Sequence, residues 1–75
     1  MIVKIRGLRI IKIKGEYIKL DSLLKFSAIA STGGEAKIII KSGDVFVDGK
    51  PCFARGKKIT NGCIIRCGDE RLLVR

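Results

Sequence analysis

Residues 17–49 read YIKLDSLLKFSAIASTGGEAKIIIKSGDVFVDG, and this stretch decides the fold. It contains two short apolar patterns with helical spacing, and the dipeptide Asp48-Gly49 follows a short run of alternating valines. An Asp-Gly pair beside such a run is a strong signal for a tight β-hairpin turn. The stretch therefore predicts two consecutive short helices followed directly by an antiparallel hairpin.

The first helix is expected over residues 21–30. Asp21 is a suitable N-cap, because its carboxylate can accept hydrogen bonds from the exposed amides of the first turn. Apolar residues at helical spacing form the stripe that should be buried, namely Leu20, Leu23, Leu24 and Ile29. A helix this short does not persist alone in water, so it must pack against the rest of the chain.

The second helix is expected to begin after Thr32, where TGGE (residues 32–35) has the spacing of a capping box. Thr32 can accept from the amide of Glu35, while Glu35 can reach back to the amide of Thr32. Gly33 and Gly34 let another backbone, or a phosphate, approach closely. The helix should end just before Gly43. Its core-facing residues are expected to be Ala36, Ile39 and Ile40.

Short alternating segments flank the helices. IVKIRG (residues 2–7) nearly repeats as IIKIKG (residues 10–15), and we expect the second copy to be the ordered strand because it leads into the helices. After the hairpin turn, Pro51 restricts the next segment to an edge strand or a loop. Residues 63–67 and 71–74 are expected to be strands. The expected fold class is α+β, with an N-terminal strand, two short packed helices and three to four short antiparallel strands.

Length and charge limit the possible functions. The chain has 75 residues, which suits one domain over residues 10–75, preceded by an N-terminal extension or strand over residues 1–9. Hydrophobic residues make up 47% of it, too many for a disordered chain. Sixteen Lys and Arg against seven Asp and Glu give a formal net charge of +9. Such an excess is typical of proteins with a polyanionic partner, and the alternative is a basic surface that serves only solubility.

The cysteines predict neither a zinc site nor a disulfide framework. Cys52, Cys63 and Cys67 form no Cys-x-x-Cys pair, and the chain has no histidine to complete four ligands. They are expected to be small buried apolar residues in a reducing compartment, the cytoplasm. No metal or cofactor is expected.

Catalysis and membrane insertion are not expected either. The sequence has no histidine, no Gly-x-x-x-x-Gly-Lys loop and no paired carboxylates, so we expect that the protein is not an enzyme. Lysines and arginines interrupt every apolar run near the N-terminus. A signal peptide needs roughly 7–15 consecutive apolar residues and a membrane helix about 20, so neither is expected.

Four stretches in order carry a resemblance to a known family. They are IKLDSLLKF (residues 18–26), TGGEAK (32–37), GDVFVDG (43–49) and RGKKI (55–59). With these, residues 10–75 resemble the RNA-binding domain first named from the ribosomal small-subunit protein S-four, also called the αL motif. Within that family, the chain resembles the stand-alone bacterial members, the YaaA/YbcJ-like proteins. The resemblance implies two packed helices, the αL motif, against a small sheet, and non-catalytic RNA binding.

The expected ligand is structured RNA of the ribosomal or transfer RNA type, in a ribosome-associated or translation setting. Proteins recognise double-helical RNA mainly by its shape, phosphates and 2′-hydroxyls, because its major groove hides the base edges. Phe26 and Phe46 are expected in the core, which favours folded RNA over stacked single strands. The residues expected to contact RNA are Lys19, Asp21, Lys25, Thr32, Gly33, Gly34, Lys37, Lys41, Lys50, Arg55, Lys57 and Lys58.

A second hypothesis is a basic adaptor that docks an acidic protein partner, for example in translation or ribosome assembly. A membrane-surface role is less favoured, because the basic residues lie on strands and short helices rather than on one long amphipathic helix. The chain is expected to be a monomer.

Overall fold

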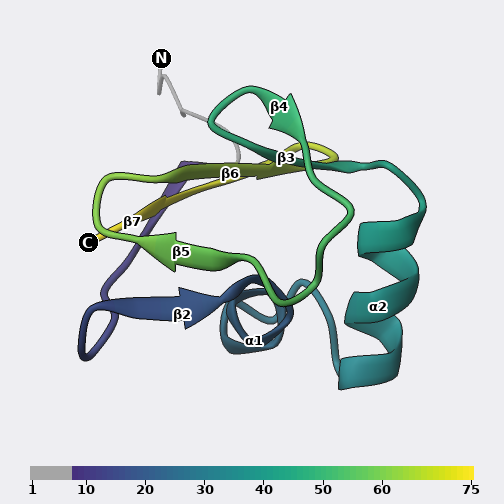
Figure 1. Cartoon of the computed structure of the whole chain (residues 1–75), viewed down its shortest axis with the longest axis horizontal. Coiled ribbons are helices and arrows are strands. Elements are labelled where there is room, and N and C mark those ends of the chain that lie inside the picture. The colour runs from purple at the N-terminus through teal and green to yellow at the C-terminus, as the bar shows by residue number, and fades with distance from the viewer. Residues whose placement is uncertain (1–7) are drawn as a thin grey trace, which may run out of the picture.

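Two helices and two sheets form the fold in this computed structural model, which describes residues 8–75 (Figure 1). The helices are α1 (Leu20–Phe26) and α2 (Gly33–Lys41). In spatial order, the larger sheet contains β1 (Leu8–Ile11), β7 (Glu70–Val74), β6 (Ile64–Cys67), β3 (Val45–Val47) and β4 (Lys50–Pro51). The smaller sheet is a ribbon of β2 (Tyr17–Lys19) and β5 (Lys58–Thr60). The expected α+β class is confirmed.

The larger sheet is antiparallel except at one edge, where β1 runs parallel to β7. Ile11 lies opposite Val74, and the pairing continues beyond both strands. The amide of Ile13 donates to the carbonyl of Arg75 at 2.8 Å. In turn, the amide of Arg75 donates to the carbonyl of Ile11 at 2.9 Å. The last strand therefore holds the segment that enters β2. The first copy of the N-terminal pattern, residues 2–7, lies outside the described residues.

The hairpin between β3 and β4 follows the prediction from its two turn residues. Asp48 has φ 51° and Gly49 has φ 85°, the pair of positive φ values that a type I′ turn requires. The Asp48 carboxylate also accepts a hydrogen bond from the amide of Ile64 at 2.9 Å, which ties the turn to β6. Pro51 lies in β4 at the edge of the sheet, where its missing amide costs no ladder bond.

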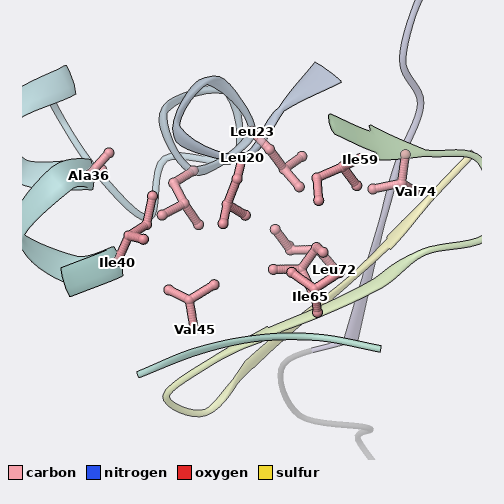
Figure 2. Close-up of a cluster of buried hydrophobic side chains, with 12 residues drawn as sticks. Leu20, Leu23, Ala36, Ile40, Val45, Ile59, Ile65, Leu72 and Val74 are labelled. Atoms are coloured by element: carbon pink, nitrogen blue, oxygen red, sulfur yellow. The ribbon is translucent and has the colours of Figure 1, made fainter. Parts of the chain in front are cut away.

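One hydrophobic core joins the helices, the ribbon and the inner face of the larger sheet. Figure 2 shows side chains from all three converging between α1, α2 and the sheet. Burying a leucine or isoleucine fully contributes about 1.5–3 kcal/mol, so these contacts dominate the stability of so small a domain. The largest fully buried side chains are Leu20, Leu23, Leu24, Ile40, Val45, Ile59, Ile65, Leu72 and Val74.

The first helix begins and ends differently from the prediction. Asp21 is not its N-cap: Lys19 occupies that position without a side-chain cap, and the Asp21 carboxylate accepts from the amide of Ser22 at 2.7 Å. The helix ends at Phe26, before residue 30. The amides of both Ile29 and Ala30 donate to the carbonyl of Leu24, so residues 27–30 form a turn that closes the helix.

The second helix begins as predicted, with one difference. Thr32 is the N-cap, and its hydroxyl accepts from the amide of Glu35 at 3.1 Å. The Glu35 carboxylate reaches the amide of Ser31 at 3.0 Å instead of that of Thr32. The helix ends at Lys41, and Gly43 follows with φ 89°, a left-handed conformation in which glycine is favoured.

Replacing Leu24 with alanine should lower the free energy of unfolding by about 2–5 kcal/mol, because the cavity lies among side chains that cannot collapse fully into it. Leu24 is completely buried in the core. Ile38→Ala is the matched control, since Ile38 on α2 is 71% exposed. It should change the free energy by no more than about 0.5 kcal/mol. Urea unfolding followed by circular dichroism measures both, and equal losses in the two variants would contradict this description of the core.

Candidate nucleic-acid interface

The start of α1 is bound to a distant basic loop through the backbone. The amide of Leu20 donates to the carbonyl of Lys57 at 2.9 Å, and the amide of Asp21 donates to the carbonyl of Arg55 at 3.0 Å. The first amides of a helix have no partner within the helix, so these two carbonyls provide the cap that a side chain does not. The basic residues of the loop are thereby held beside the first turn of α1.

The β2–β5 ribbon places further cations next to this loop. Lys19 lies directly opposite Lys58 in the antiparallel register. Like charges in that position repel each other and are destabilising. Both side chains are exposed to solvent, which screens part of the repulsion. The Lys58 ammonium also lies 4.9 Å from the centre of the Tyr17 ring, within range of a cation–π contact.

Three predicted lysines line one open hollow between the β3–β4 hairpin and β5. Lys50, Lys57 and Lys58 belong to its wall, and its volume is about 460 Å³. We call it the basic hollow. Asp48 is the acidic residue in its lining, and the carboxylate of that residue accepts from the amide of Ile64. Three lysines against one acidic residue give the lining a net positive charge, which suits a negatively charged group.

A second group of predicted residues lies on the helices. The Lys25 ammonium is 4.0 Å from the position that a Cβ would occupy on Gly33, so it lies beside the first turn of α2. Lys37 and Lys41 follow Gly33 at intervals of four residues and are exposed. Residues four apart share one face of a helix. We call Lys25, Lys37 and Lys41 the helix lysines.

Residues 52–57, the segment between β4 and β5, connect the two groups. At one end, the Phe53 ring lies 3.5 Å from the position that a Cβ would occupy on Gly43, just after α2. At the other end, the carbonyls of Arg55 and Lys57 accept from α1. Figure 1 shows this segment crossing from β4 past the helices to β5. The structure therefore brings Lys19, Lys50, Lys57 and Lys58 together with the backbone of Arg55, whereas Lys37 and Lys41 lie on α2.

The aromatic residues differ from the prediction in one respect that matters for binding. Phe26 was expected in the core but is 66% exposed. The buried stripe of α1 follows Leu20, Leu23 and Leu24, and Phe26 falls outside that spacing, so the sequence contained the signal. Phe46 is half-buried on β3, with the Arg66 guanidinium 4.5 Å from the centre of its ring. Exposed aromatics are therefore available for stacking.

The three cysteines are free thiols that pack, half-buried, against the core. No group of three or more metal-ligating side chains comes together within residues 8–75. Burial raises the pKa of the Cys67 thiol, and the negative charges of Asp44 and Glu70 raise it further. Glu70 also pairs with Arg9 at 2.9 Å.

Comparison with known protein families gives a match over most of the chain. The sequence model of the S4 domain family matches residues 11–75, which includes every candidate contact residue. No curated protein matches the chain. Within residues 8–75, no helix is long and apolar enough to span a bilayer.

The raised pKa of Cys67 should be visible in its alkylation rate. Iodoacetamide reacts with the thiolate, so the pH at half-maximal rate should be higher in the folded protein than in urea. Mass spectrometry of the Cys67 peptide measures this rate. Asp44→Asn should lower that pH, because it removes one of the charges that raise the pKa of the thiol.

Asp69→Asn is the matched control, since Asp69 neighbours Glu70 in the chain but does not contribute to the raised pKa. It should leave the alkylation profile unchanged. Identical midpoints in the folded and unfolded protein would show that the thiol is not in the environment described here.

Proposed function

Because the chain belongs to the S4 domain family, a family of RNA-binding domains, we propose that it is a non-catalytic protein that binds structured RNA through its lysine-bearing surface. The proposed contacts are the helix lysines, the basic hollow, and Lys19 and Arg55 beside it. Asp21 has a different proposed role: its backbone amide holds the basic loop at the start of α1.

The observation that carries the proposal is the gathering of cations from separate parts of the chain. Lys19 comes from β2, Lys50 from the β3–β4 hairpin, and Lys57 and Lys58 from the end of the loop and the start of β5. Bringing like charges together opposes folding, so the arrangement is best explained by an anionic partner. A nucleic-acid backbone presents closely spaced phosphates that match several ammonium groups at once.

The helix lysines favour a folded RNA over an extended one. Lys37 and Lys41 are one turn apart on α2, and Lys25 lies beside the first turn of the same helix. The amides at Gly33 and Gly34 begin that helix, where the backbone favours negative charge. A row of contacts along α2, together with the basic hollow, suits two phosphate strands that converge at a bend or junction.

We propose ribosomal or transfer RNA as the partner, in a translation or ribosome-associated setting, because the family takes its name from a ribosomal protein. Three half-buried free thiols suit a reducing compartment, and we propose the cytoplasm. We also propose that the chain acts as a monomer and that residues 10–75 form the functional domain.

The outer face of the larger sheet favours a second candidate function, an adaptor for an acidic protein partner. Ile10, Leu73 and Ile64 form one row across β1, β7 and β6, and Ile10 and Ile64 are exposed. Arg66 and Arg71 form the neighbouring row on the same face. Exposed apolar residues beside arginines are typical of protein interfaces. Binding to a protein partner that persists after nuclease treatment and is unaffected by added RNA would favour this function.

Replacing Lys25, Lys37 and Lys41 with glutamine should weaken binding to a structured RNA about ten-fold or more at fixed salt, which corresponds to about 1.4 kcal/mol. The melting temperature should stay close to that of the wild type. These side chains are exposed and glutamine is a comparable helix former, so the fold does not depend on their charges. RNA titration and thermal unfolding measure the two properties.

The matched control replaces Arg66, Arg71 and Arg75 with glutamine. It removes the same number of charges from a different surface, so it separates local contact from net charge. Its affinity for RNA should fall less than that of the helix-lysine variant. Equal losses of RNA affinity in the two variants would show that binding depends on net charge alone. Undiminished affinity in a folded helix-lysine variant would place the RNA on another surface.

A further inference from the structure

A second hollow lies between the segment before β2 and the end of α1. Its volume is about 360 Å³ and its lining is mainly apolar. Tyr17 is 42% exposed and Phe26 is 66% exposed. We call it the aromatic hollow, and its lining consists of Lys12, Ile13, Lys14, Tyr17, Ile18 and Phe26.

The exposure of Phe26 needs an explanation that the core does not supply. Leu20, Leu23 and Leu24 already commit the inner side of α1 to the core, and Phe26 adds nothing to that packing. A large aromatic ring left in water forgoes the free energy of its burial. Tyr17 lines the same hollow from β2, so two aromatic residues from different elements line one site. Such a pair is suited to hold a flat or apolar group.

The charges around the hollow select the kind of occupant. Lys12 and Lys14 lie in its lining, and over residues 12–19 Glu16 is the single acidic residue against three lysines. An apolar side chain of a protein partner would gain nothing from those ammonium groups. A nucleotide has both a flat base for the rings and a phosphate for the lysines.

The aromatic hollow also adjoins the basic hollow. Lys58 lines the basic hollow, and its ammonium lies 4.9 Å from the centre of the Tyr17 ring, which lines the aromatic hollow. A phosphate held by Lys58 therefore places the next nucleotide of the same strand near Tyr17 and Phe26. A paired base in the interior of a helix cannot use these rings, because both its faces are stacked on its neighbours.

We propose that the aromatic hollow binds the base of one unpaired nucleotide, a bulge or a loop base, that adjoins a helix held by the lysines. This inference rests on the proposed function. It adds that the protein recognises the presence of an unpaired base. Stacking accepts every base because every base has a π-face, so the preference is for an unpaired position and not for a sequence.

The experiment compares two RNA hairpins that differ only in a single bulged nucleotide, the fluorescent base 2-aminopurine. The wild-type protein should bind the bulged hairpin more tightly by about ten-fold, within the range that stacking of one base provides. The fluorescence should fall on binding, because stacking quenches this base. Phe26→Ala should bind both hairpins equally and leave the fluorescence unchanged.

Two further variants keep the test decisive. Phe26→Leu keeps an apolar side chain on α1 but removes the ring, and it should lose the preference in the same way. Phe53→Ala is the matched control, because Phe53 is 60% exposed but lies beside Gly43, outside the aromatic hollow. It should keep both the preference and the quenching. Circular dichroism verifies the fold of each variant.

The outcomes separate this inference from the proposed function. If the wild type binds both hairpins equally, or if Phe26→Leu keeps the full preference, the inference is overturned and the hollow belongs to a protein side chain, while RNA binding stands. If the wild type binds neither hairpin at low salt, the proposed function fails, and the inference fails with it.

Discussion

The arrangement of this surface depends on two backbone hydrogen bonds, from the first amides of α1 to the carbonyls of Arg55 and Lys57. They join segments that lie far apart in the chain and cap a helix that has no side-chain cap. Because β5 begins at the next residue, the same contact aligns Lys58 with Lys19 and brings Ile59 into the core. The helix cap, the ribbon and the basic hollow are therefore one structural unit, and displacing the loop would disperse the cations.

The chain separates its apolar and charged residues by layer. The inner sides of both helices and of the larger sheet are committed to the core, as Figure 2 shows, so the lysines remain at the surface. This arrangement leaves binding residues replaceable at little cost to stability. It also makes the aromatic hollow a candidate binding site, because Phe26 and Tyr17 are large side chains that lie exposed outside the core. The two hollows meet at Lys58, where phosphate binding and base stacking would act together.

Local signals predicted local structure well. The Asp48-Gly49 turn, the Thr32 cap and the end of α2 before Gly43 all depend on residues within a few positions of one another. Phe26 was placed wrongly although the local spacing contained the signal, whereas the other differences arise from contacts between distant parts of the chain. Asp21 does not cap α1, because the first amides of the helix donate to backbone carbonyls more than thirty residues away. The parallel pairing of β1 with β7 likewise joins opposite ends of the described chain. The convergence of Lys19, Lys50 and Lys58 could not be predicted from spacing for the same reason.

The most direct test of the account is to map the contact surface by nuclear magnetic resonance. The ¹⁵N-labelled protein would be titrated with an RNA hairpin that carries one bulged nucleotide. We expect shifts in the backbone amides of Lys19, Gly33, Lys57 and Lys58, on the face formed by the helices and the ribbon. The amide resonances of Ile10 and Leu73, on the outer face of the larger sheet, should not shift. Shifts confined to that outer row would contradict the account, because they would place the RNA on the face opposite to the basic hollow.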